Sequence, residues 1–151
     1  MIFPKIAVYR ALRTAHPEDA MRIIEDATAE AGRENAARFG RVTSHAAGRA
    51  LFMKVFKLGV KKLFGEKAGF RQENCREGKR SFCMDIVQCP YYAHCLQEGV
   101  PELGHVFCDS DDYNYGQLPG IRFRRSGTLA RGDDRCDFHI EEISADDDPI
   151  L

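Results

Sequence analysis

The hydrophobic pattern of this chain changes period near Phe70, and this change constrains the fold more than any other feature. Between Pro17 and about Gly65 the apolar residues recur three and four positions apart, as they do on helices. Beyond Phe70 they form short extended runs bounded by glycine and polar residues, which is typical of strands. Helices followed by strands predict an α+β fold, in which N-terminal helices pack on an antiparallel sheet.

Two long helices are expected in the first half. Pro17, which is followed by two acidic residues, suits the first turn of a helix that runs to about Phe39 and stops near Gly40. Ser44 is expected to cap a second helix that ends near Gly65.

The second of these helices is amphipathic and basic. Its apolar stripe consists of Ala47, Leu51, Val55 and Leu58, widened by Phe52, Phe56 and Leu63. Its lysines, Lys54, Lys57 and Lys61, are expected on the opposite face. Such a helix can lie on an anionic membrane or in the groove of a partner. A core helix with a lysine-rich solvent face is the favoured interpretation, because a small domain has a single stripe of this kind to bury; membrane contact is not expected.

Four strands and two short helices are expected in the second half. The strands are predicted at 70–75, 80–87, 121–125 and 135–143. The two short helices, at 90–99 and 101–113, each begin at a proline and are inserted between the second and third strands. The prediction is one domain over residues 1–143, followed by an acidic tail at residues 144–151.

Composition and charge exclude several classes of protein. A chain of 151 residues that is 44% hydrophobic can form one domain with a core. The formal net charge of −1 argues against nucleic-acid binding driven by overall charge. No segment approaches the roughly 18 apolar residues of a membrane span, and Lys5 and Arg10 interrupt the apolar start, unlike a secretory signal. A cytoplasmic protein is expected, and its oligomeric state stays open.

Six cysteines without an export signal predict reduced thiols rather than disulfides. No CxxC pair is present, so no cofactor is expected from the spacing. Zinc is kept as an alternative, with Cys89, Cys108 and Cys136 as its ligands if they converge in space. The competing interpretation is that these residues are free thiols buried in the core.

The segment that follows Pro101 carries several ionisable side chains. Glu102, His105 and Cys108 are spaced three apart and share one helical face, on which a histidine can activate a thiol. The alternative is a core cysteine beside a surface histidine. Asp111 belongs to an acidic run in which neighbouring carboxylates raise one another's pKa and can supply a general base, or merely solvate the helix. Farther along, Arg125 lies in an arginine-rich stretch that suits either a substrate carboxylate or a charged strand edge.

Together these residues resemble the L-2-amino-thiazoline-4-carboxylic acid hydrolase family. The resemblance rests on seven short motifs in this order: Cys89–Tyr92, Gly99–Gly104, Phe107–Asp111, Phe123–Arg125, Gly127–Leu129, Gly132 and Cys136–Phe138. They cover about the last third of the chain. The sequence is also more loosely similar to vinyl-reductase-type small-molecule-binding domains, which end in a cysteine-bearing hairpin.

The family resemblance implies a hydrolase that opens a cyclic thiazoline-type substrate to an N-carbamoyl amino acid. Glu102 and Asp111 are then the expected acid–base pair, with Cys108 as an alternative nucleophile. The substrate carries a carboxylate, for which Arg125 is the expected clamp. The remaining expected substrate-binding residues are Thr128, Cys136 and Asp137. Glu102, Cys108 and Asp111 are expected to line one pocket that Cys136 and Asp137 close.

A second interpretation, from a different class, is a non-catalytic domain that binds or senses a small molecule. The two are distinguished by the pocket, because an enzyme needs its acid, base and nucleophile to converge on one cavity. A sensor needs only an apolar cavity with a few polar anchors.

Overall fold

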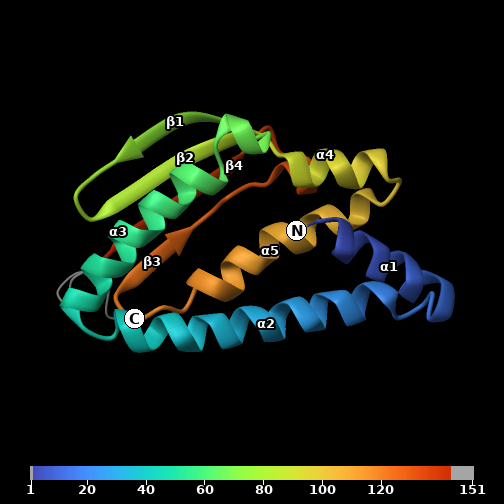
Figure 1. Ribbon diagram of the computed structural model, residues 1–151, viewed down its shortest axis with the longest axis horizontal. Coiled ribbons are helices and arrows are strands. Elements are labelled where there is room, and N and C mark those ends of the chain that lie inside the picture. Colours follow the sequence, from blue (N-terminus) through green and yellow to red (C-terminus); the bar gives the residue numbers. More distant parts are fainter. Residues whose placement is uncertain (1, 144–151) are drawn as a thin grey trace.

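The computed structural model describes residues 2–143, and it has the predicted α+β architecture (Figure 1). Helices come first, and a four-stranded antiparallel sheet follows with helices inserted between its second and third strands. The elements are α1 (Phe3–Ala15), α2 (Ala20–Thr43), α3 (Ala46–Leu63), η1 (Glu66–Ala68), β1 (Arg71–Glu77), β2 (Ser81–Gln88), α4 (Pro90–Gln97), η2 (Pro101–Leu103), α5 (Gly104–Tyr115), β3 (Ile121–Arg124), η3 (Leu129–Arg131) and β4 (Cys136–Glu142).

The strands lie in the order β1-β2-β4-β3, and every neighbouring pair is antiparallel. In β2, buried Phe82, Met84 and Ile86 alternate with more exposed residues, as expected for a sheet with one covered face. The pairing of Phe82 with Ile140 and of Met84 with Phe138 places the buried residues of β4 on that same face. The covered face is the one against which α3 packs (Figure 1).

The buried apolar residues form two clusters. The first lies between α3 and the sheet and includes Met53, Phe82 and Ile140. The second joins α1, α2, α4 and α5, with Leu103 at its centre and no exposed surface. The two clusters meet at Tyr91, which packs against both.

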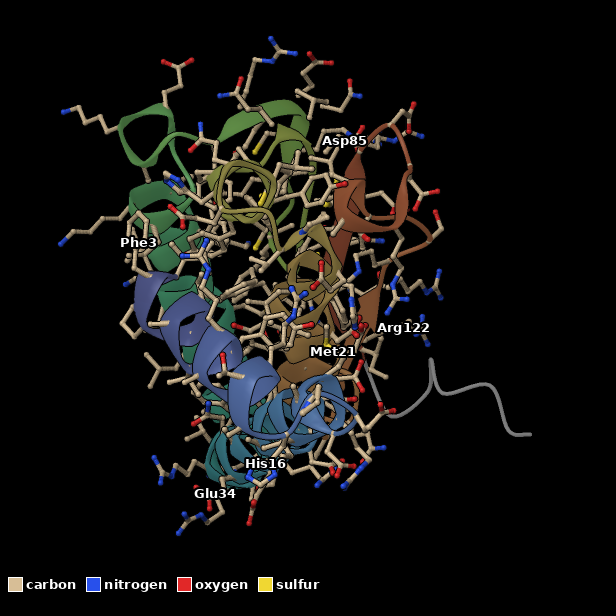
Figure 2. All side chains as sticks on the ribbon, turned by 90° about the vertical axis from the view of Figure 1, so that its right-hand side faces the viewer. Phe3, His16, Met21, Glu34, Asp85 and Arg122 are labelled. Atoms are coloured by element: carbon tan, nitrogen blue, oxygen red, sulfur yellow. The ribbon has the colours of Figure 1, made fainter. Side chains whose placement is uncertain are left out.

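The long helix α2 packs along α5 (Figure 1). Gly32 makes this contact close, because a Cβ atom at that position would lie 2.4 Å from the Cβ atom of Tyr113. Seen from the end where α1 lies, Asp85 on β2 and Arg122 on β3 mark the sheet side, away from Glu34 on α2 (Figure 2). Helix α5 contacts both α2 and β3, and so lies between α2 and the sheet (Figure 1).

Several predicted helix boundaries are wrong. Helix α1 was not predicted, since only Ile6 and Tyr9 are buried along it and so short a stripe has little periodicity. Helix α2 continues through Gly40 to Thr43. Ser44 does not cap α3, because its hydroxyl donates to the carbonyl of Arg41 at 3.0 Å instead.

The predicted orientation of α3 is also wrong. Leu51, Val55 and Leu58 are exposed to solvent, with 56%, 60% and 62% of their surfaces accessible. Lys57, which was expected in solvent, is only 8% exposed, and its ammonium group donates to the carbonyl oxygens of Gly78 and Lys79 at 2.5 and 3.1 Å. The sheet is covered instead by the neighbouring side of the helix, with Phe52, Met53, Phe56 and Val60. This helix has apolar residues on most of its circumference, so the partner decides which side is buried.

The predicted acidic tail at residues 144–151 lies outside the described residues. Within residues 2–143, no helix is both long and apolar enough to cross a membrane.

Candidate functional site

The chemistry-bearing residues of the second half surround a cavity of about 150 Å³ between the sheet, α4, α5 and η3. Most of its wall is apolar or aromatic, including Tyr91, Phe107 and Phe138. Its polar lining consists of Cys89, Cys108, Ser110, Asp111, Arg125 and Cys136. The cavity is smaller than the roughly 300–1,000 Å³ of sites for drug-sized ligands, so it suits a small molecule.

Two thiols face each other in this cavity. Cys108 on α5 and the first residue of β4, Cys136, both line it and influence each other's pKa, and the Cys108 thiol also donates weakly to the carbonyl oxygen of Gly104 at 3.9 Å. The interaction with Cys108 lowers the pKa of Cys136, although burial opposes the change, and the backbone N–H of Leu129 also donates to the Cys136 sulfur at 3.3 Å. The same interaction and burial raise the pKa of Cys108. Cys136 is therefore the member of the pair that holds a thiolate more readily.

Asp111 is the acid of the cavity. Burial is the main cause that raises its pKa to about 7, while the neighbouring Arg125 guanidinium opposes the rise. The carboxyl is not sealed off, since 31% of the side chain is accessible. It also lines a second, mostly apolar cavity of about 230 Å³ between α3 and α5. A carboxyl with a pKa near 7 can both give and take a proton at neutral pH.

Arg125 is nearly buried, with 7% of its side chain exposed, and it is fixed by α5. Its Nη1 donates to the carbonyl oxygen of Cys108 at 3.0 Å and lies 3.4 Å from a carboxylate oxygen of Asp111. Its Nη2 donates to Asp112. A fixed cation at the wall of a small cavity can bind an anionic ligand when Asp111 is protonated, because one of its two carboxylate partners is then neutral.

The loop after β3 positions these groups from outside the cavity. Asp137 accepts hydrogen bonds from the backbone N–H groups of Ser126 and Gly127 at 2.9 and 2.7 Å. Burial alone would raise the pKa of Asp137, but these hydrogen bonds and one from the Ser126 hydroxyl outweigh it, so the pKa is lowered. Thr128 is buried, and its N–H donates to Asp133 at 2.7 Å. This loop places the Leu129 amide over the Cys136 sulfur.

The structure therefore brings together Cys108, Asp111, Arg125 and Cys136 among the predicted site residues. Thr128 and Asp137 are adjacent and hold the loop, but they do not line the cavity.

Glu102 is not brought to the cavity, and the prediction that it shares a pocket with Cys108 and Asp111 is wrong. Its carboxylate accepts from the Tyr9 hydroxyl at 3.0 Å and pairs with Arg13 at 3.1 Å, on the surface beside α1. Because α1 was not predicted, nothing in the sequence pattern indicated these partners.

His105 does not serve Cys108 either. Its Nε2 lies 2.9 Å from a carboxylate oxygen of Glu25, so the ring links α5 to α2. The Cys–His nucleophile is thus not supported by the arrangement of α5.

All six cysteines lie within the described residues, and all are free. The alternative zinc set was Cys89, Cys108 and Cys136. Across residues 2–143, no three His, Cys, Asp or Glu side chains are arranged so that they could hold a metal ion. The three thiols line one cavity without the convergence that zinc requires.

Two features of the site were not predicted. One is the Leu129 N–H, a backbone donor that no side-chain pattern indicates. The other is Tyr115, whose pKa is raised to about 12 by burial and by the nearby Asp111, and which forms part of the apolar surroundings of that carboxyl.

The fold and the cavity define an α+β protein with a small, mostly apolar site that holds a thiol pair, a carboxyl and a buried arginine. The sequence matches the family model of L-2-amino-thiazoline-4-carboxylic acid hydrolase over residues 1–140, and the chain belongs to this family. The family name implies a hydrolase with a small-molecule substrate.

Comparisons with individual proteins add little. A search of curated proteins finds no match. One similar solved structure is that of a trafficking protein particle complex subunit 3 from Naegleria fowleri, covalently bound to palmitic acid. It is 12% identical, the match covers 93% of this chain and 95% of that one, and the TM-score is 0.38, which is too low to carry an argument.

Proposed function

We propose that this protein hydrolyses 2-amino-thiazoline-4-carboxylate or a close analogue to an N-carbamoyl amino acid at the cavity between Cys136, Asp111 and Arg125. The observation that carries the proposal is the convergence of a thiolate-stabilising pair, a carboxyl with a pKa near 7 and a buried cation on one small cavity. Membership of the family supplies the class of reaction.

The charges of the site complement those of the substrate. Arg125 binds the carboxylate in this proposal, through the same guanidinium that contacts Asp111 at 3.4 Å. The Cys136 thiolate then faces the amidine carbon, which lies between the ring sulfur and the ring nitrogen. Cys136 replaces Cys108 as the proposed nucleophile, because the interaction between the two thiols lowers the pKa of Cys136 and raises that of Cys108.

In the first step the Cys136 sulfur bonds to the amidine carbon and the bond from that carbon to the ring sulfur breaks. The departing sulfur takes a proton from Asp111, which leaves an isothiourea on Cys136 and an ionised carboxylate. In the second step Asp111 takes a proton from water, whose oxygen adds to the same carbon. The bond to Cys136 then breaks and restores its thiolate, and the hydroxyl proton moves to the former imine nitrogen, so that the carbonyl of the N-carbamoyl product forms.

The test is turnover of 2-aminothiazoline-4-carboxylate by the full chain and two variants. Cys136→Ser and Asp111→Asn are each expected to lower kcat by about a hundredfold or more, since each removes a reacting group. Cys83→Ser and Asp109→Asn are the matched controls, because neither residue lines the cavity. They are expected to keep full turnover.

Intact-mass measurement of rapidly quenched enzyme separates the nucleophile from a mere thiol neighbour. A substrate adduct on wild-type protein that is missing from Cys136→Ser supports the covalent route. Full turnover by Cys136→Ser would exclude it. If wild-type protein binds the substrate without turnover, the domain is a ligand-binding module and the hydrolase proposal fails. The assignment to the cytoplasm stays a prediction, which locating the tagged protein in its native cell would test.

A further inference from the structure

The outward side of α3 carries an apolar stripe in solvent. Leu51, Val55 and Leu58 are each more than half exposed, and their spacing of four and three residues aligns them along the helix. Single exposed apolar residues are ordinary on a soluble protein. Three large ones in a row on one helix are typical of a surface that meets an apolar partner.

Lysines accompany this stripe. Lys54 borders it between Leu51 and Leu58, and Lys62 extends it by one turn beyond Leu58. Both are exposed, and neither forms an ion pair with any residue between 2 and 143. We call Leu51, Lys54, Val55, Leu58 and Lys62 the outward face of α3. Its charge and its apolar surface are both unsatisfied within the described part of the chain.

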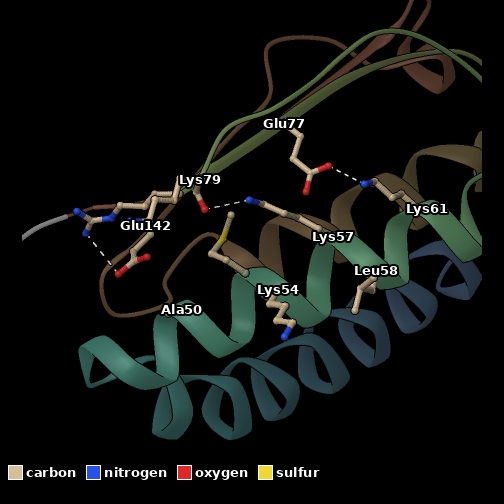
Figure 3. A pocket seen from close by; sticks show the side chains of 10 residues that line it. Ala50, Lys54, Lys57, Leu58, Lys61, Glu77, Lys79 and Glu142 are labelled. Atoms are coloured by element: carbon tan, nitrogen blue, oxygen red, sulfur yellow. Dashed lines mark hydrogen bonds and ion pairs between the residues drawn. The ribbon is translucent and has the colours of Figure 1, made fainter.

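A basic pocket of about 510 Å³ adjoins this face, between α3 and the turn from β1 to β2. Figure 3 shows Lys57 and Lys61 pointing across it to the strands, while Lys54 and Leu58 project from the side of α3 away from them. Its charged lining is Lys54, Lys57, Lys61, Lys79, Arg80, Glu77 and Glu142.

Three of the five cations in the pocket are already occupied. The ammonium of Lys57 is bound by backbone carbonyls, Lys61 pairs with Glu77 at 2.6 Å, and Arg80 pairs with Glu142 at 3.3 Å. Lys54 and Lys79 have no ion-pair partner among residues 2–143. Since the whole chain has a net charge of −1, this excess of positive charge is local.

We propose that the outward face of α3 docks on an anionic lipid bilayer. Leu51, Val55 and Leu58 then enter the boundary between headgroups and acyl chains, about 5 to 10 Å deep. Lys54 and Lys62, which belong to the same face, contact lipid phosphates at the same level. A bilayer of this kind satisfies the apolar stripe and the adjoining positive charge together, which a purely apolar or cationic partner would not.

A second copy of the chain fits the face less well. Pairing two identical stripes across a two-fold axis would bring the lysines of both copies close together, without acids on the face to neutralise them. The charge of the face therefore favours an anionic surface over self-association.

The test is co-sedimentation of the full chain with vesicles of phosphatidylcholine alone or mixed with phosphatidylserine. Binding to the mixed vesicles is expected, with little binding to phosphatidylcholine alone and weakening at high salt. The pair of changes Lys54→Glu and Lys62→Glu is expected to weaken binding at least tenfold, since each lysine near an anionic surface contributes about fivefold. The pair Leu51→Ser and Leu58→Ser is expected to abolish insertion.

Matched controls come from exposed positions on other helices. Val8→Ser on α1 removes an apolar residue that is 52% exposed, and Arg33→Glu on α2 reverses a surface charge. Both are expected to bind vesicles as the wild type does, and all variants are expected to keep the wild-type melting temperature. Failure of the wild type to bind mixed vesicles, or equal binding by the α3 variants, overturns the proposal. A wild-type dimer that Leu58→Glu converts to a monomer overturns it too, because a second copy then covers the face.

Discussion

The cavity and the outward face of α3 place polar and apolar groups in opposite ways. In the cavity, thiols, a carboxyl and a guanidinium are withdrawn from water among aromatic side chains, and each has a partner inside the fold. On α3, large apolar side chains are held in water beside lysines. Burying ionisable groups and exposing large apolar side chains both make folding less favourable. We therefore associate the cavity with a chemical reaction and the outward face of α3 with binding to another surface.

The sharpest test of this contrast compares apolar residues on the two sides of the molecule. Phe82 is 1% exposed, and Phe82→Ala is expected to lower the free energy of unfolding by about 3 to 5 kcal/mol. Leu58→Ala, at an exposed position, is expected to change it by less than about 0.5 kcal/mol. Denaturant unfolding measures both. A cost for Leu58→Ala as large as that for Phe82→Ala would mean that the face is covered in the folded protein.

A smaller effect is expected at the buried lysine of α3. Lys57→Ala leaves the carbonyl oxygens of Gly78 and Lys79 without their donor, which is expected to cost about 1 to 3 kcal/mol. Lys54→Ala, one turn earlier on the exposed side, is the control and should be nearly neutral. Equal stabilities of the two variants in denaturant unfolding would contradict the observed orientation of α3.

The next effect depends on pH and concerns Asp111. Its folded pKa, about 7, lies above the ordinary value of 3.8, so the folded protein holds a proton that the unfolded chain loses. Below about pH 4 Asp111 is protonated in both the folded and the unfolded state, so it does not change the free energy of unfolding. As the pH rises from about 4 through 7, the unfolded chain loses this proton first, and the free energy of unfolding falls. Asp111→Asn avoids this loss, and the variant is expected to gain about 1 to 2 kcal/mol over the wild type between pH 4 and 8, allowing for the solvent that reaches the carboxyl.

Thermal unfolding of wild type and Asp111→Asn at both pH values measures that gain. The difference between the two proteins isolates Asp111 from the other groups that titrate in this range, Cys136 among them. A difference that stays constant from pH 4 to 8 would show that burial does not raise the pKa of this carboxyl.

The smallest effect is expected at Glu102. Its ion pair with Arg13 lies at the surface, and a glutamine can still accept from the Tyr9 hydroxyl, so Glu102→Gln is expected to cost less than about 1 kcal/mol. Turnover should stay within about twofold of the wild type, because Glu102 does not line the cavity. A hundredfold loss with an unchanged melting temperature would restore Glu102 as a catalytic acid or base.

Much of the second half of the chain was predictable because its signals are local. Prolines at the starts of α4 and η2 and the extended runs on either side define the order of strands and inserted helices. Asp111, Arg125 and both thiols of the facing pair were predicted as site residues from motifs. The Leu129 amide, the partners of Glu102 and the distance between Cys108 and Cys136 depend on contacts between distant segments, which no local pattern contains.

The sequence by itself determined the α+β class and the order of the α-helices and strands from α2 onward, and it supplied the candidate residues for chemistry, because periodicity and turn residues act over a few positions of the chain. Only the tertiary structure decided which side of α3 is buried and which ionisable groups share a cavity. Helix α3 has apolar residues on both sides, and the sheet selects the side with Phe52, Met53 and Val60. The charge of Lys57 can be buried only because the turn after β1 supplies two carbonyl oxygens at the right place.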